Sequence, residues 1–115
     1  MYSIPEITTK LKKFSQDRDW SQFHSPKNLV MALTSEVGEL SEIFRWMSEE
    51  ESKNPSSEVK NKVSEELADI FNFLVMIADQ YDIDILKASE NKIALNDKKY
   101  PIEKSKGSSK KYNEY

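Results

Sequence analysis

The chain has 115 residues, no cysteine and a formal net charge of −3, and 37% of its residues are hydrophobic. This length fits one domain, although a core of this size leaves about a third of the unfolded chain's surface exposed. The missing cysteines exclude disulfides and thiolate metal sites, and the negative balance argues against binding to a nucleic-acid polymer, which needs a basic surface. A phosphate ligand bridged by a cation is still compatible with this charge.

The sequence predicts neither a membrane partner nor a targeting segment. No apolar run approaches the roughly 20 residues of a membrane helix. The residues from Met1 to Glu6 lack the basic start and apolar stretch of a signal peptide. We therefore expect a cytoplasmic protein.

Helix signals in the first half of the chain predict an all-α fold. The chain holds two glycines and four prolines. A capping box at Ser3 starts a first helix that runs to about Arg18. Residues 17–24 form a connector, and Ser25 caps a second helix, which begins at Pro26 and runs to about Met47.

The second half of the chain continues the pattern. The polar stretch 48–57 is predicted as a loop, in which Asn54 and Pro55 start a third helix that ends near Asp79. Asp82 or Asp84 caps a fourth helix ending near Lys99. We expect one domain at residues 1–101, built as a four-helix bundle around a long central antiparallel hairpin, and an irregular polar tail at 102–115.

Two pairs of acidic residues lie three residues apart, Glu36 with Glu39 on the second helix and Glu66 with Asp69 on the third. Each pair projects from one helix face, with Cβ atoms about 5–6 Å apart. A solvated acidic face is the ordinary interpretation of such a pair, but no Lys or Arg lies within residues 28–44 or 63–86 to relieve the repulsion. A cation site is the alternative.

The register of the predicted hairpin favours that alternative. In an antiparallel pair with a symmetric loop, Glu36 lies level with Asp69, and Glu39 with Glu66. Four carboxylates at one level are costly unless they are protonated or a cation neutralises them, and a cation is the simpler explanation. All-oxygen ligation selects Mg²⁺ or Mn²⁺. A di-iron or di-manganese bundle site usually needs two Glu-x-x-His motifs, whereas His24 is the sole histidine.

Beyond these acids, the sequence resembles the MazG-like all-α nucleoside triphosphate pyrophosphohydrolases, most closely the dCTP pyrophosphatase branch. The resemblance is nearly full length. The matching residues are Phe14, Arg18, Asp19, Trp20, Gln22, Phe23, His24, Asn28, Leu29, Glu36, Val37, Gly38, Glu39, Leu40, Phe44, Trp46, Glu65, Glu66, Leu67, Asp69, Leu74, Val75, Lys92, Asn96, Tyr100, Pro101, Ser108, Ser109, Lys111, Tyr112 and Glu114.

The resemblance implies Mg²⁺-dependent hydrolysis of a deoxynucleoside triphosphate, dCTP or a modified dCTP, to the monophosphate and pyrophosphate. It makes Glu36, Glu39, Glu66 and Asp69 the metal ligands, and Glu39 or Glu42 would orient or deprotonate the water. The expected nucleotide contacts are Trp20, Ser21, Gln22, Phe23, His24, Trp46, Phe73, Lys92 and Asn96. It also implies a homo-oligomer: a homotetramer, or a homodimer as the smaller alternative. The pockets of this assembly are expected to include residues of neighbouring subunits.

Two positions depart from the branch pattern. Phe73 stands where the branch often has a tyrosine, and Leu11 where a pocket histidine can occur. Each change removes a polar group from the expected pocket, so the base preference can differ from that of the branch.

The expected nucleotide contacts also have ordinary structural explanations. Taken alone, Trp20 and Trp46 are more typical of core or interface aromatics, and His24 of a surface or capping histidine. Lys92 and Asn96 are typical of a solvated helix face. A broader enzyme that accepts dATP or dUTP, and a non-catalytic helical interaction module, are the alternative functions.

Overall fold

The computed structural model describes residues 1–114, which form helices and no strand. The all-α prediction is confirmed. No helix within these residues is long and apolar enough to cross a membrane. The elements are α1 (Ile4–Asp17), η1 (Ser21–Phe23), α2 (Pro26–Phe44), α3 (Glu49–Lys53), α4 (Ser57–Gln80), α5 (Ile85–Lys99), α6 (Ile102–Ser105) and η2 (Tyr112–Glu114).

A side-chain cap begins each long helix of the described chain, and three of these four caps were predicted from the sequence. Ser3 and Glu6 form the capping box of α1. The Ser25 hydroxyl accepts from the Asn28 N–H at 3.2 Å at the start of α2. Asp84 caps α5 through the Lys87 N–H. Each cap satisfies a backbone donor that has no partner inside its helix.

The region between α2 and α4 differs from the prediction. α2 ends at Phe44, three residues before Met47, and Ser48 opens a short helix, α3, with its own capping box. Ser56 caps α4 and accepts from the Val59 N–H at 3.2 Å. The prediction that Asn54 caps this helix was wrong, because Asn54 ends α3 instead.

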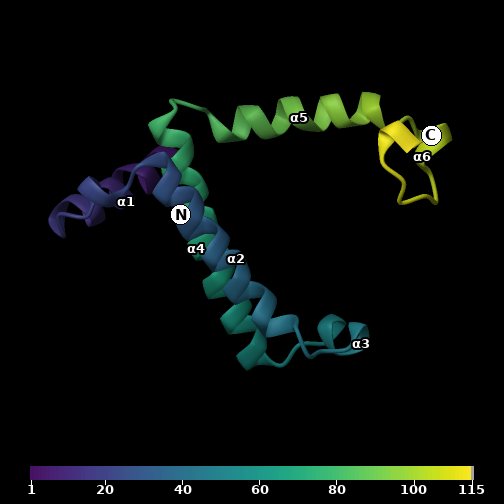
Figure 1. Ribbon diagram of the computed structural model, residues 1–115, viewed down its shortest axis with the longest axis horizontal. Helices are drawn as coiled ribbons and strands as arrows, with labels where there is room; N and C mark the ends of the chain where they lie inside the picture. Colours follow the sequence, from purple (N-terminus) through teal and green to yellow (C-terminus); the bar gives the residue numbers. More distant parts are fainter. Residues whose placement is uncertain (115) are drawn as a thin grey trace. The chain divides into compact units, whose positions relative to one another are not determined.

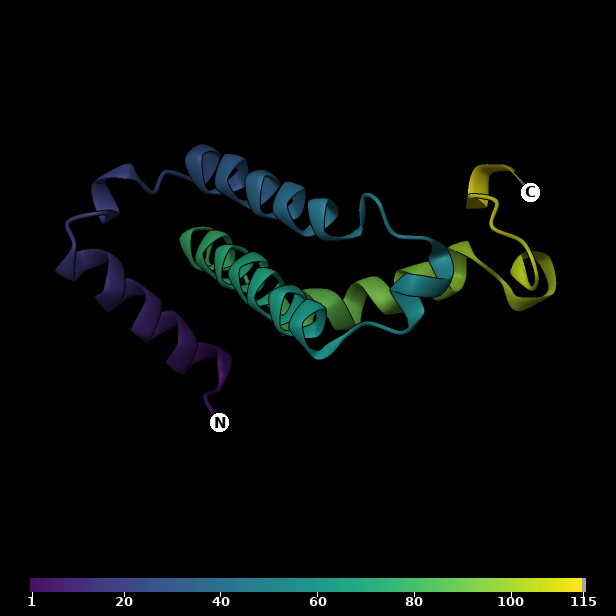
Figure 2. The same ribbon diagram turned by 90° about the horizontal axis from the view of Figure 1, so that it is seen from below.

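The described part of the chain divides into two compact units, Met1–Asp82 and Ile83–Tyr115. In the first unit α2 and α4 lie side by side as an antiparallel hairpin (Figures 1 and 2). α1 packs against α4. The buried apolar residues are Leu29 of α2 and Val75 and Ala78 of α4, so the core lies where these helices meet.

The second unit holds α5, α6 and η2. The rings of Tyr100 and Tyr112 meet edge to face with centroids 6.0 Å apart, and the Lys99 ammonium lies 4.9 Å from the Tyr112 ring centre. The segment after Pro101 was predicted to be irregular, but it contains the short helices α6 and η2.

Large apolar side chains also remain exposed on the hairpin. They include Val30, Met31 and Val37 of α2 and Leu67 and Leu74 of α4, whose exposed fractions run from 37% to 56%. Val37, Leu67 and Leu74 belong to the apolar stripes that helical spacing defines. A single chain therefore buries only part of these stripes.

Candidate functional site

The hairpin brings three of the four predicted metal-ligating acids into one cluster. One carboxylate oxygen each from Glu36, Glu39 and Glu66 lies within 4.8 Å of the others. This agrees with the register expected from the sequence. Asp69 follows Glu66 on α4 by three residues, and it lines a pocket together with Glu36.

The cluster brings several carboxyls together, and two of them are partly buried. Burial, followed by the carboxyls of Glu66 and Glu39 and the charge of Asp69, raises the pKa of Glu36 from 4.5 to about 7. The Oε2 atoms of Glu36 and Glu66 are buried and accept no hydrogen bond from residues 1–114. Buried acceptors without donors are costly, so these all-oxygen groups fit a hard divalent cation.

A pocket of about 430 Å³ opens beside the cluster. Its apolar walls come from α1, the connector and α4: Leu11, Phe14, Trp20, Phe73 and Met76. Its polar lining is Ser15, His24, Glu36, Asp69 and Asn72. The arrangement places carboxylates and aromatic rings in one cavity, with no Lys or Arg among these lining residues.

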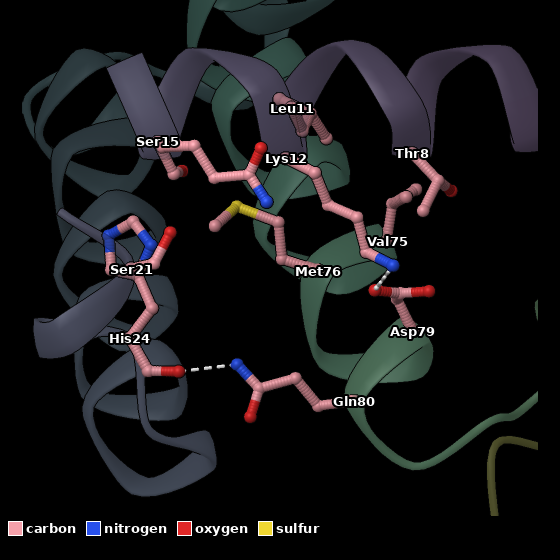
Figure 3. A pocket seen from close by; sticks show the side chains of 11 residues that line it. Thr8, Leu11, Lys12, Ser15, Ser21, His24, Val75, Met76, Asp79 and Gln80 are labelled. Carbon is pink, nitrogen blue, oxygen red and sulfur yellow. Dashed lines mark hydrogen bonds and ion pairs between the residues drawn. The ribbon is translucent and has the colours of Figure 1, made fainter. Parts of the chain in front are cut away.

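A smaller pocket of about 240 Å³ adjoins the first and shares Leu11, Ser15, His24 and Met76 with it. Figure 3 shows it between α1, the connector and α4. The Lys12 ammonium lies 3.2 Å from the Asp79 carboxylate, and the Gln80 amide donates to the backbone carbonyl of His24. These contacts fix α1 and the connector against α4, so they hold the shared wall in place.

Several predicted nucleotide contacts line these pockets. Trp20, His24 and Phe73 line the larger one, and Ser21 lines the smaller one. The Phe14 and Trp20 rings meet edge to face with centroids 5.8 Å apart, which orients the Trp20 ring.

Other predicted contacts lie elsewhere. The Gln22 amide donates to the Asp19 carboxylate at 2.9 Å. The exposed side chains of Phe23 and Trp46 are absent from the lining of both pockets. Trp46 is 84% exposed, with the Arg45 guanidinium 5.0 Å from its ring centre.

Three further predicted site residues line neither pocket. Glu42 pairs with Arg45 at 2.9 Å, one turn beyond the acidic cluster. Lys92 and Asn96 lie on α5 in the second unit.

The sequence analysis missed four residues of the larger pocket, Phe14, Ser15, Asn72 and Met76. Helical spacing contained the signal, because Asn72 follows Asp69 by three residues and Ser15 follows Leu11 by four. Residues at these separations share a helix face. Extending the faces of Leu11 and Asp69 by one turn would have found Phe14, Ser15 and Asn72, and a second turn along α4 reaches Met76.

The sequence comparisons identify the family of the chain. The model of the MazG-like family matches residues 31–115. The chain belongs to the MazG-like family.

Two relatives bear the name dCTP pyrophosphatase 1. The protein of Rattus norvegicus is 39% identical over 112 residues, which cover 96% of this chain and 66% of the relative. The protein of Homo sapiens is 38% identical over 114 residues, which cover 97% of this chain and 67% of the relative. The chain thus spans about two thirds of the length of these relatives.

A solved structure is also similar, that of a pyrophosphatase from Archaeoglobus fulgidus. It has a TM-score of 0.78 and 35% sequence identity, and the alignment covers 88% of this chain and 94% of the other. The similarity therefore extends over most of both chains.

Proposed function

We propose that this chain hydrolyses a deoxynucleoside triphosphate, dCTP or a modified dCTP, to the monophosphate and pyrophosphate. The observation that carries the proposal is the cluster of carboxylates on α2 and α4, which adjoins a pocket with aromatic walls. Relatives named dCTP pyrophosphatase 1 support this substrate class.

The proposed metal ligands are Glu36, Glu39, Glu66 and Asp69, and the proposed ion is Mg²⁺, with Mn²⁺ as the alternative. Oxygen donors and the buried acceptors of Glu36 and Glu66 support this choice. A bound ion would offset the charge of the phosphate groups and of the pyrophosphate that leaves.

The pocket residues would hold the nucleoside. An aromatic plane suits a nucleobase, and Trp20 and Phe73 provide such planes in the larger pocket. Glu36 and Asp69 line the same pocket, so the triphosphate would extend from the aromatic walls toward the acids.

We assign the proton-accepting role to Glu39. A water molecule that attacks the α-phosphorus must lose a proton, and a nearby carboxylate can orient it and accept that proton. Glu39 belongs to the cluster and is more exposed than Glu36 and Glu66. Glu42 is the other candidate, but its carboxylate already accepts from Arg45 at 2.9 Å.

We propose further nucleotide contacts, and bounds and a location for the domain. Ser21, Gln22, Phe23 and His24 would complete the nucleotide site near the connector, and Lys92 and Asn96 of α5 are also proposed as nucleotide contacts. We also keep residues 1–101 as the family domain, 102–115 as its tail, and the cytoplasm as its location.

We propose a homotetramer, with a homodimer as the smaller alternative. The exposed apolar side chains of the hairpin support self-association. Trp46, which is 84% exposed in one chain, would then contribute to the pocket of a neighbouring subunit.

The test is incubation with a panel of nucleoside triphosphates, with and without Mg²⁺, followed by identification of products. We expect dCMP and pyrophosphate from dCTP, and loss of turnover when a chelator removes the metal. Comparable turnover of dATP or dUTP would replace the dCTP preference by a broader one. No hydrolysis of any nucleotide would favour a non-catalytic helical module.

A further inference from the structure

A largely buried serine in the pocket wall carries a hydroxyl that has no partner among the described residues. Ser15 of α1 is 5% exposed and lines both pockets. Its hydroxyl makes no hydrogen bond with residues 1–114, whereas Thr8 on the same helix donates to the Ile4 carbonyl at 2.8 Å. The buried side-chain oxygens without a partner in the described chain belong to Glu36 and Glu66, so the Ser15 hydroxyl opens to the pocket, where a ligand group can take the place of water as its partner.

Asn72 presents a second unsatisfied polar group to the larger pocket. This half-buried residue of α4 has no hydrogen bond from its carboxamide to the described residues. Other amides near the connector are engaged: Asn28 donates to the Phe23 carbonyl at 2.8 Å, and Gln80 donates to the His24 carbonyl. The carboxamide of Asn72 is therefore available to a ligand.

The surroundings indicate which part of a ligand these groups meet. Phe14, Trp20 and Phe73 give the larger pocket apolar faces, which suit the faces of a base but leave its polar edge unsatisfied. A carboxamide carries a donor and an acceptor side by side, and so does the edge of a pyrimidine base. Leu11 and Phe73 offer no such groups.

We propose that Ser15 and Asn72 recognise the edge of the base and are the specificity-determining residues of this pocket. This inference rests on the proposed function, since it takes the ligand to be a deoxynucleoside triphosphate. Asn72 pairs with adjacent donor and acceptor atoms of the base, and Ser15 bonds a further polar atom of the same base.

The first experiment separates base recognition from general binding. Two probes are titrated into the full chain by calorimetry with Mg²⁺: the α,β-methylene analogue of dCTP, and 2′-deoxyribose 5′-triphosphate without a base. We expect Ser15→Ala and Asn72→Leu each to weaken the dCTP analogue on the order of tenfold, the effect of one lost hydrogen bond. Binding of the base-free probe should not change.

Matched controls are Ser64→Ala and Asn61→Leu, exposed positions of α4 that line neither pocket. They should leave both affinities unchanged. Equal weakening of both probes by the Ser15 and Asn72 variants would indicate a structural role and overturn the proposal. So would unchanged affinity for the dCTP analogue.

The second experiment uses Asn72→Asp, which keeps the shape but removes the donor. A carboxylate accepts from the amino group of cytosine and repels the O4 atom of uracil. We expect the ratio of kcat/KM for dCTP to that for dUTP to rise about tenfold or more, whatever happens to the absolute rates. An unchanged ratio would contradict contact between Asn72 and the base.

The wild-type chain separates the two possible failures. If it hydrolyses no nucleotide and binds neither probe, the proposed function fails and the inference falls with it. If it hydrolyses dCTP while the variants leave the discrimination between probes intact, only the inference fails.

Discussion

Individual carboxyls in the acidic cluster differ in their surroundings. Glu36 and Glu66 each bury one oxygen without a donor, whereas Glu39 is exposed. The sequence predicted their meeting, because helical spacing and an antiparallel register fix which residues share a level. It could not show that Trp46 and Gln22 lie outside the two pockets of a single chain, because the lining of a pocket depends on neighbours remote in the sequence.

Glu39→Gln tests the role of the exposed acid. We expect kcat to fall by about a hundredfold or more at saturating Mg²⁺, because the amide cannot accept the proton of water. The helix content measured by circular dichroism should not change. Glu65→Gln, an exposed neighbour on α4, is the control, and near-normal turnover of the Glu39 variant would exclude an essential role.

Glu36 makes the stability of the metal-free protein depend on pH. Its folded-state pKa of about 7 exceeds the ordinary 4.5, so the folded state holds a proton that the unfolded chain releases earlier. The free energy of unfolding should therefore fall as pH rises from about 4.5 to about 7, and level off above that.

Urea unfolding between about pH 5 and about pH 8 in a chelator measures this slope. Excess Mg²⁺ should restore stability most at the alkaline end, where the carboxylates are charged. Glu36→Gln should remove most of the slope, and a slope as steep as that of the wild type would refute the assignment to Glu36.

At the scale of elements, the long helices follow from local signals. Ser3, Ser25 and Asp84 cap helices as predicted, because a cap depends on neighbours within three residues. The failures lie at residues 48–57, where Ser48, Asn54 and Ser56 all resemble caps. Ser48 caps the short helix α3 and Asn54 ends it, which leaves Ser56 to cap α4. The sequence did not predict α3, because its five residues are too few to show a helical period.

Ser56→Ala tests the cap of α4. Loss of the bond to the Val59 N–H should lower the free energy of unfolding by about 1 kcal/mol. Chemical unfolding at one fixed protein concentration measures the change. Ser57→Ala, inside the first turn, should have a smaller effect, and equal effects would argue against a capping role for Ser56.

At the scale of the whole molecule, a single chain leaves much apolar surface uncovered. Leu29, Val75 and Ala78 form its buried apolar core, while Val30 and Met31 are 45% and 56% exposed. Helical periodicity marks an apolar face without identifying what covers it, so the sequence alone could not predict which of these side chains stay exposed in one chain.

Val30→Lys tests whether this face mediates assembly. A charge placed in an apolar interface must be desolvated, so we expect a lower oligomer mass by light scattering at equal concentration. The chain should stay helical, because Val30 is half exposed in one copy. Ser52→Lys on α3 is the control, and an unchanged mass for Val30→Lys would exclude this face.

The lining of the larger pocket contains acids and no Lys or Arg, and nearby Lys12 already pairs with Asp79. A triphosphate entering alone would meet only like charge there. The proposed triphosphate and cation would therefore bind cooperatively, and by thermodynamic reciprocity each would strengthen the other's affinity by the same factor. Scarcity of the cation would weaken nucleotide binding even when the nucleotide is plentiful.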